Sequence, residues 1–123
     1  MAGRLLVGVV DDDESVRESL PELLGLLGFD ARAFASAEEF LRCGSLQNTH
    51  CLVLDITMPG MSGPELYSEL LARGHAIPTI FISAHINENV RSDLMKQGAI
   101  ACLMKPFNEK ELGYALQTAV GVP

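Results

Sequence analysis

The sequence has no tryptophan and few basic residues, cysteines or long apolar runs. Lys and Arg together number 9 against 16 acidic residues, and the formal net charge is −7. This balance argues against nucleic-acid binding by the chain itself, because neutralising phosphates requires clustered basic side chains. The three cysteines, Cys43, Cys51 and Cys102, are scattered without the spacing of a metal site. We therefore expect free thiols in a reducing compartment.

No apolar run approaches the length of a transmembrane helix. The N-terminus does not have the pattern of a signal peptide, because one arginine precedes a short apolar run that stops at a cluster of acids. We expect a cytoplasmic protein without membrane contact. The 123 residues are enough for one buried core, and no linker, repeat or low-complexity segment divides them. Residues 1–123 are interpreted as a single domain.

Four short apolar runs each end at a polar residue. The runs and the residues that follow them are Leu5–Val10 with Asp11 and Asp12, Cys51–Leu54 with Asp55, Thr79–Ile82 with Ser83, and Ala101–Met104 with Lys105. A less regular run lies near Phe29–Phe34. Short apolar runs that alternate with helix-like stretches are typical of buried parallel strands. The pattern predicts an α/β fold, a doubly wound five-stranded parallel sheet with helices on both faces.

The predicted helices begin at polar capping residues. The pairs in which a Ser or Asn precedes a Glu as in a capping box are Ser36 with Glu39, Ser62 with Glu65, and Asn108 with Glu111. Asp12 or Asp13 can cap the first helix, which should run to about Leu27. Pro21 lies inside that helix and removes one hydrogen bond, so we expect a bend there rather than a break.

A fourth helix is predicted over about 87–97, between Asn87 and Gly98. Three of its apolar side chains, Val90, Leu94 and Met95, are expected to face inward. The other positions are mostly polar, so this stripe should be the surface that packs on the sheet.

The polar residues at the strand ends suggest a metal site. Ligands of parallel α/β sheets bind beyond the carboxyl ends of the strands. If the runs are neighbours, Asp11, Asp12 and Asp55 meet Lys105 there and leave a negative surplus. Two like charges ~4 Å apart repel by roughly 4 kcal/mol at an effective dielectric constant near 20. A hard divalent cation balances the surplus, and oxygen ligands favour Mg²⁺, which Mn²⁺ could replace, over Zn²⁺.

The same residues suit a phosphoryl group. A carboxylate can attack phosphorus and form an aspartyl-phosphate. Asp55 stands alone at the end of the third run and is the best candidate nucleophile, with Asp11 and Asp12 as the metal pair. Lys105 can neutralise charge on the transferring group, and the Ser83 hydroxyl can donate to another phosphoryl oxygen.

Four segments of this sequence together match one family. They are VVDDDESVR (Val9–Arg17), LDITMPGMSG (Leu54–Gly63), IPTIFISAH (Ile77–His85) and KPF (Lys105–Phe107). In this order and spacing, the chain resembles the receiver domains of two-component response regulators over essentially its whole length. The phrases SAEEFL and MSGPEL look most like the FixJ/NarL type. The resemblance implies the flavodoxin/CheY-like strand order 2-1-3-4-5.

The resemblance also implies roles for individual residues. Asp55 would be the phosphoacceptor, and Mg²⁺ would be held by Asp12 directly, by Asp11 largely through water, and by Asp55 and the backbone carbonyl of Thr57. Ser83 and Lys105 would contact the phosphoryl group, with a cis bond between Lys105 and Pro106.

The phosphoryl donor implied by the resemblance is a phosphohistidine on a sensor histidine kinase. The receiver would catalyse its own phosphorylation and slow dephosphorylation, without multiple turnover. Phosphorylation would shift a two-state equilibrium, read out on the fourth helix, fifth strand and fifth helix, and could drive homodimerisation through the fifth-helix face. Regulators of this type usually continue into a DNA-binding segment, so the chain is either stand-alone or the N-terminal regulatory part of a transcriptional regulator.

One position departs from the family pattern. Cys102 stands where members usually carry Tyr or Phe, which leaves a shift of the hydroxyl residue, coupled to helix movement, as the route of the switch. We interpret Cys102 itself as a small core side chain. His85 is either a surface loop residue or a neighbour of the phosphoryl group.

Two other functions remain open. The chain could be an interaction module that keeps the receiver fold without using phosphorylation, a reading that Cys102 supports. It could also be a haloacid-dehalogenase-like phosphatase, but such enzymes carry a second aspartate two residues after the nucleophile, where this chain has Thr57.

Overall fold

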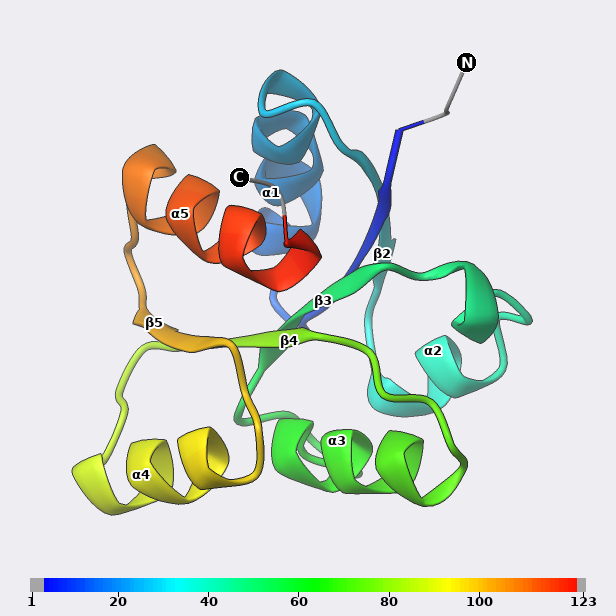
Figure 1. Cartoon of the computed structure of the whole chain (residues 1–123), viewed down its shortest axis with the longest axis vertical. Coiled ribbons are helices and arrows are strands. Elements are labelled where there is room, and N and C mark those ends of the chain that lie inside the picture. Colours follow the sequence, from blue (N-terminus) through cyan, green and yellow to red (C-terminus); the bar gives the residue numbers. More distant parts are fainter. Residues whose placement is uncertain (1–3, 122–123) are drawn as a thin grey trace.

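Five parallel strands form one sheet in the computed structural model, which describes residues 4–121 (Figure 1). The strands are β1 (Leu6–Val10), β2 (Asp30–Phe34), β3 (Cys51–Asp55), β4 (Thr79–Ser83) and β5 (Ala101–Met104). Their order in the sheet is β2-β1-β3-β4-β5, and every neighbouring pair is parallel. The predicted α/β class and strand order are confirmed.

Five helices cover the two faces of this sheet. They are α1 (Glu14–Leu26), α2 (Ala37–Leu41), α3 (Gly63–Ala72), α4 (Glu88–Lys96) and α5 (Glu109–Val120). Helices α1 and α5 lie on one face, and α2, α3 and α4 lie on the other (Figure 1). A short 3₁₀ helix, η1 (Leu46–Asn48), precedes β3 and was not predicted from the sequence. No helix within residues 4–121 has the length and apolar character needed to cross a membrane.

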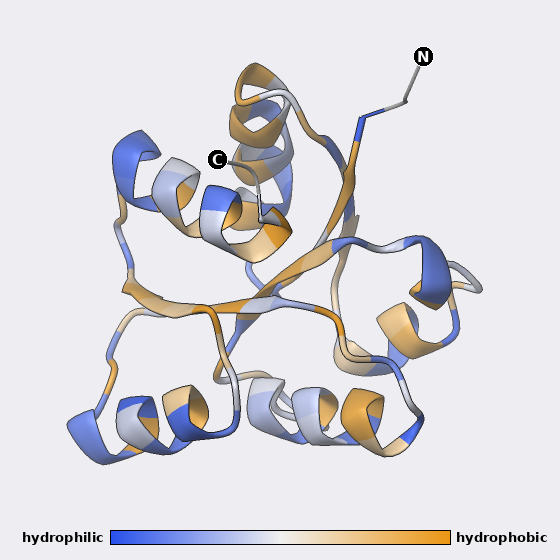
Figure 2. Cartoon of the chain, viewed as in Figure 1, coloured by the Kyte–Doolittle hydropathy of each residue, from blue (hydrophilic) through white to orange (hydrophobic). Residues whose placement is uncertain are grey.

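The sheet divides the core in two, because successive side chains of a strand point to opposite faces. On one face, strand side chains such as Val9, Val53 and Ile80 pack against Leu24 of α1 and Leu116 of α5. The opposite face is filled by side chains from the strands and from α2, α3 and α4, among them Leu52, Leu54, Phe81, Phe40, Leu66, Leu70 and Leu94. Apolar residues accordingly concentrate along the strands and the inner faces of the helices, with polar residues outward (Figure 2). The core fixes where the strand ends lie.

The helix starts follow the sequence, with one exception. Ser62 and Asn108 form complete capping boxes with the glutamates three residues later. At α2 the box is only half formed: the Ser36 hydroxyl accepts the Glu39 N–H, but Glu39 Oε2 accepts the N–H of Ala35 at 2.9 Å. Ala35 follows the last residue of β2, so its N–H has left the strand and takes this carboxylate as its partner.

Helix α1 begins where an aspartate cap was expected. Asp13 is the capping residue, and its carboxylate accepts the N–H of Ser15 at 3.0 Å. The helix continues without interruption through Pro21 to Leu26. The prediction that proline would not break the helix is therefore confirmed.

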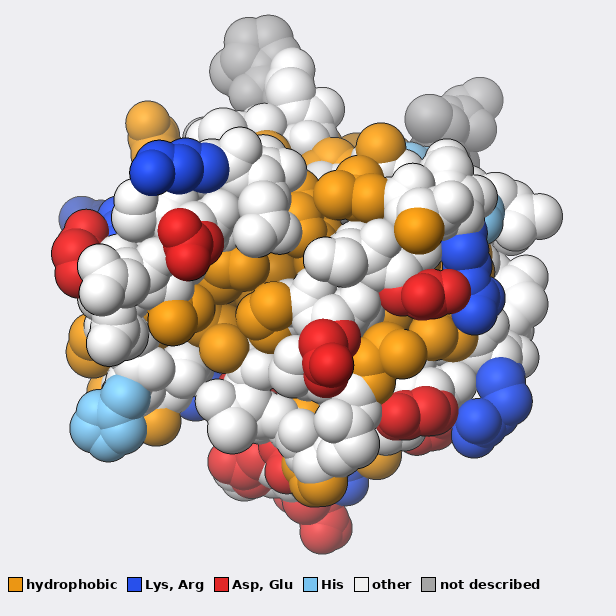
Figure 3. Space-filling model, turned by 90° about the horizontal axis from the view of Figure 1, so that it is seen from below, with side chains coloured by type: hydrophobic (Ala, Val, Ile, Leu, Met, Phe, Trp, Pro, Cys, Tyr) orange, Lys and Arg blue, Asp and Glu red, His pale blue; other side chains and the backbone are white. Residues whose placement is uncertain are grey.

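The predicted inner face of α4 is wrong at two of its three positions. Leu94 is buried, whereas Val90 and Met95 are 38% and 40% exposed. Helix α4 packs near the edge of the sheet, beside the short strand β5, so only a narrow stripe of its surface is covered. Seen from the side where α3 and α4 lie, apolar side chains remain open among polar and charged ones (Figure 3).

Candidate functional site

The sheet brings two acidic strand ends together. Strands β1 and β3 are hydrogen-bonded neighbours in which Val10 pairs with Leu54, so Asp11 and Asp55 are the next residues on adjacent strands. Oxygens of Asp11, Asp12 and Asp55 all lie within 4.8 Å of one another. The arrangement follows from the parallel topology, because only parallel neighbours present the same end at the same edge.

Lys105 reaches the same cluster from the loop after β5. Its Nζ donates a hydrogen bond to Asp11 Oδ2 at 2.9 Å and lies 3.9 Å from Asp55 Oδ2. Partial burial disfavours the ammonium, but the hydrogen bond to Asp11 and the charges of Asp11 and Asp55 outweigh it and raise the pKa of Lys105. The bond between Lys105 and Pro106 is cis, as the resemblance implied.

The acids of this site are buried unequally. Asp11 is 0% exposed and Asp55 6% exposed, whereas Asp12 is exposed. Burial and the neighbouring charge of Asp11 raise the pKa of Asp55 to about 7, and the attraction of Lys105 offsets only part of the rise. Near neutral pH Asp55 is therefore close to taking up a proton, and a bound cation would relieve the same unfavourable charge. Three close carboxylates with only oxygen atoms to offer fit a hard divalent cation such as Mg²⁺.

Backbone amides hold the two buried carboxylates in place. Asp11 Oδ1 accepts the N–H of Asp13 at 2.9 Å, and Asp55 Oδ1 accepts the N–H of Thr57 at 3.4 Å. Arg17 adds a hydrogen bond that sequence reasoning missed. Its Nη1 donates to the backbone oxygen of Asp11 at 3.0 Å. The arginine lies at the end of the matched VVDDDESVR segment, which was the available signal.

Ser83 ends β4 beside the acids, but its hydroxyl has another partner. The Oγ donates to the backbone oxygen of His85 at 2.9 Å and accepts the His85 N–H at 3.3 Å. Ser83, His85 and Thr57 nevertheless line the same hollow of about 290 Å³ as Asp55 and Lys105. The hydroxyl is thus close to the acidic cluster but is engaged by the loop that follows β4.

Gly63 is a second residue that sequence reasoning missed. It opens α3, and a Cβ there would collide with the backbone oxygen of Asp55. The N–H of Gly63 donates to the backbone oxygen of Ile56 at 3.0 Å and closes the base of the loop between β3 and α3. A glycine directly after the capping Ser62 was the signal, because glycine is a poor residue inside a helix.

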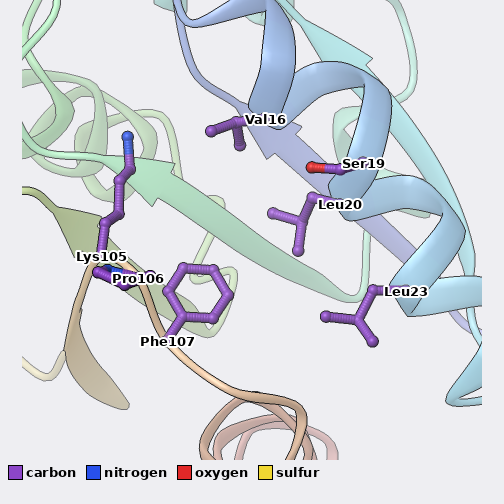
Figure 4. Close-up of a pocket in the computed structure, with 7 residues that line it drawn as sticks. All are labelled: Val16, Ser19, Leu20, Leu23, Lys105, Pro106 and Phe107. Carbon is purple, nitrogen blue, oxygen red and sulfur yellow. The ribbon is translucent and has the colours of Figure 1, made fainter.

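An apolar hollow of about 580 Å³ adjoins the charged site. It is lined by Val16, Ser19, Leu20 and Leu23 of α1 and by Lys105, Pro106 and Phe107 of the loop after β5. Figure 4 shows Lys105 and the Phe107 ring across the hollow from the α1 side chains. Lys105 therefore belongs both to the acidic cluster and to an apolar surface.

The structure brings Asp11, Asp12, Asp55 and Lys105 into contact or near contact, and it places Ser83 and Thr57 along the adjoining hollow. The part that the Thr57 carbonyl plays stays a prediction. Cys102 is buried in the core on the side of α2, α3 and α4, which confirms its reading as a core side chain.

Comparison with known proteins places this arrangement in one family. The model of the response regulator receiver domain matches residues 7–117. The transcriptional regulatory protein TdiR of Thauera aromatica is 39% identical over 117 residues, which cover 94% of this chain and 51% of that protein. The transcriptional regulatory protein FixJ of Azorhizobium caulinodans is 39% identical over 121 residues, 98% of this chain and 57% of that protein. This chain spans about half the length of these relatives.

A solved structure is similar to this chain in both sequence and fold. The crystal structure described as FixJ-N is 34% identical, covers 100% of this chain and 98% of its own, and superposes with a TM-score of 0.84. The sequence and the backbone of this chain are therefore similar to those of FixJ-N.

Proposed function

The chain belongs to the response regulator receiver domain family, and on that premise we propose that Asp55 accepts a phosphoryl group from a sensor histidine kinase in an Mg²⁺-dependent reaction. The observation that carries the proposal is the cluster itself, with Asp55 near two other carboxylates and 3.9 Å from the Lys105 ammonium. Residues 1–123 are then one receiver domain, the regulatory part of a transcriptional regulator in the cytoplasm.

The metal ion would be held by Asp12, Asp55 and the Thr57 carbonyl, with Asp11 acting largely through water. Both oxygens of Asp11 already accept hydrogen bonds, from Asp13 and Lys105, whereas Asp12 is exposed and free to bind an ion directly. When bound, Mg²⁺ or Mn²⁺ supplies the positive charge that lets an anionic phosphoryl group approach three carboxylates.

In the proposed transfer, an oxygen of Asp55 forms the new bond to phosphorus while the phosphorus–nitrogen bond of the donor phosphohistidine breaks. The histidine nitrogen keeps the electron pair. Lys105 has its ammonium within reach of Asp55, and its raised pKa keeps it charged throughout. It can therefore neutralise the phosphoryl oxygens as the aspartyl-phosphate forms.

Ser83 supplies the conformational response in this proposal. To donate to a phosphoryl oxygen, its hydroxyl has to leave the backbone oxygen of His85. That exchange would release the loop between β4 and α4 and change the surface of α4, β5 and α5. Exposed apolar side chains on that surface, including Met104 and Tyr114, support homodimerisation as the readout.

The donor domain of the kinase is proposed to dock in the apolar hollow between α1 and the loop after β5. The phosphohistidine has to reach Asp55, and this hollow shares Lys105 with the acceptor site. Ser19 is an exposed residue of its lining, so Ser19→Arg should fill the hollow without disturbing the core. Transfer from the kinase should fall at least tenfold, whereas labelling by acetyl phosphate should not change. Equal loss with both donors would contradict the docking proposal.

The experiment that tests the function uses a small phosphodonor. The protein is incubated with Mg²⁺ and acetyl phosphate and then analysed by intact mass spectrometry. Wild type should gain one phosphoryl group, and Asp55→Asn should gain none. An unmodified wild type, or labelling that survives in Asp55→Asn, would overturn the proposal.

The second candidate is an interaction module that does not use phosphorylation. The buried Cys102, at a position where relatives usually carry an aromatic residue, favours it. Titration with Mg²⁺ and then beryllofluoride distinguishes the two functions. A receiver should bind the ion and change conformation, and an interaction module should do neither.

A further inference from the structure

The loop between β3 and α3 carries Thr57 and is held at few points. Its start is fixed by the Ile56 N–H, which donates to the backbone oxygen of Ile82 at 3.0 Å. Its base is closed by the bond from the Gly63 N–H to Ile56, and Met58 is buried. Beyond Met58 the chain turns at Gly60, which has a φ of 74° and is exposed. The Met61 side chain packs, partly buried, against the core, and a hydrogen bond to the backbone of the tip would add to this anchoring.

Glu38 of α2 supplies that contact from a distant part of the sequence. Its Oε2 accepts the N–H of Met61 at 3.1 Å, across 23 positions of the chain. The same oxygen would lie 3.1 Å from a Cβ added at Gly60, so the carboxylate sits directly against the turn. The bond joins a helix on the sheet face opposite α1 to the loop that follows the acceptor aspartate.

The neighbouring Glu39 does a different job on the same helix. Its carboxylate accepts the N–H of Ala35 and its own N–H donates to Ser36. Both contacts lie within the start of α2 and do not reach the loop. Of these two adjacent glutamates, Glu39 therefore makes only local contacts at the start of α2, and Glu38 makes the long-range contact to the loop.

We propose that Glu38 is a positioning residue of the acceptor site: by holding Met61 it keeps the loop between β3 and α3 in the shape that presents Thr57 beside Asp55. The inference rests on the proposed function, because the segment matters only if Thr57 helps to bind the metal ion. A carboxylate accepting a backbone N–H makes one of the stronger hydrogen bonds available to a loop. Outer contacts of this kind commonly set the affinity of a metal site.

The test compares Glu38→Ala, Glu38→Gln and the matched control Glu39→Ala with wild type. Hydrogen exchange measured by NMR on the metal-free protein reports the Met61 amide directly. Its protection should fall about fivefold in Glu38→Ala and stay near wild type in Glu39→Ala. A glutamine oxygen can still accept the N–H, so Glu38→Gln should recover most of the protection.

Titration with MgCl₂, followed by amide shifts, gives the second readout. The dissociation constant should rise about tenfold in Glu38→Ala and much less in Glu38→Gln and Glu39→Ala. Unchanged Met61 protection, or Mg²⁺ affinity within twofold of wild type in Glu38→Ala, would overturn this inference. Failure of wild type to bind Mg²⁺ would instead overturn the proposed function, so the two failures are distinguishable.

Discussion

Two ion pairs of similar length lie in different surroundings. Lys105 Nζ is 2.9 Å from Asp11 Oδ2, and their side chains are 22% and 0% exposed. Arg73 Nε is 2.7 Å from Glu69 Oε2, one turn away on α3, and their side chains are 47% and 39% exposed. Burial strengthens the attraction between charges but makes either charge costly if it is left alone. The site pair should therefore be sensitive to loss of one partner, and the helix pair should be nearly indifferent.

The carboxylates of the two regions differ in the same way. Burial, with Asp11 beside it, raises the pKa of Asp55. At the start of α3, the N–H of Ser62 lowers the pKa of the exposed Glu65. At a helix N-terminus the helix dipole stabilises the negative charge of a carboxylate. At the strand ends the buried charge is unfavourable unless a cation or a proton offsets it, which is typical of a functional site.

The largest effect is expected from Lys105→Met in metal-free protein. The change leaves Asp11 and Asp55 without their cation, and removing one partner of a buried pair should lower the free energy of unfolding by about 3 kcal/mol. Urea unfolding at pH 8 in EDTA measures this. Lys110→Met on the exposed side of α5 is the control, for which a change below about 0.5 kcal/mol is expected. Equal losses in the two variants would remove the distinction between site and surface.

Asp55→Asn should instead raise the free energy of unfolding of the metal-free protein. The folded protein holds the proton of Asp55 up to a pH of about 7, against an ordinary pKa of 3.8. The stability of the metal-free protein should therefore fall as the pH rises between these values. Asparagine cannot ionise, so the variant should exceed wild type by about 2 kcal/mol at pH 8. The two proteins should converge near the ordinary pKa of the carboxyl group.

Unfolding curves at several pH values in EDTA follow this difference. Glu65→Gln is the matched comparison, because the lowered pKa of Glu65 makes its contribution present above its ordinary pKa of 4.5 and lost on acidification. Both variants should depart from wild type as the pH rises above the ordinary carboxyl pKa, but in opposite directions: Asp55→Asn should be more stable than wild type and Glu65→Gln less stable. A constant offset between Asp55→Asn and wild type would show that proton binding at Asp55 is not the cause.

What the sequence predicts well here depends on regular geometry. Apolar runs that end at Asp11, Asp55 and Lys105 define strands, and parallel neighbours must place those ends at one edge. The Ser62 and Asn108 boxes involve residues three positions apart and are equally readable. Contacts that depend on turns or on the edge of the sheet are harder to predict from the sequence. The fourth helix shows this, since its apolar stripe gave no sign that part of it would stay exposed.

Three contacts of the site lay outside the reach of sequence patterns. The Ser83 hydroxyl takes a backbone oxygen two residues ahead, a choice made by the shape of the loop after β4. Glu38 finds the N–H of Met61 only once α2 and the loop after β3 have been packed together. Arg17 stands in a segment that pointed to the family, but its bond goes to a backbone oxygen, which no residue type identifies. Each contact joins a side chain to backbone whose direction is set by tertiary structure.

A smaller effect is expected at the start of α3. Ser62→Ala removes a complete capping box and should lower the free energy of unfolding by about 1 kcal/mol. Acetyl phosphate labelling at saturating Mg²⁺ should not change, because Asp55 and its neighbours keep their contacts. The control is Ser68→Ala on the exposed surface of the same helix, which should be nearly neutral. Loss of labelling in Ser62→Ala would mean that the helix start and the acceptor site are coupled.

The smallest effect is expected from the exposed pair on α3. Glu69→Ala should lower the free energy of unfolding by at most about 0.5 kcal/mol, because both side chains are solvated and must be ordered to meet. A double-mutant cycle with Arg73→Ala isolates the pair, and its coupling should shrink further in 1 M salt, where the screening length is about 3 Å. The pair is shorter than the one at the site, so a coupling of 2 kcal/mol or more would show that distance, and not burial, sets the strength of both.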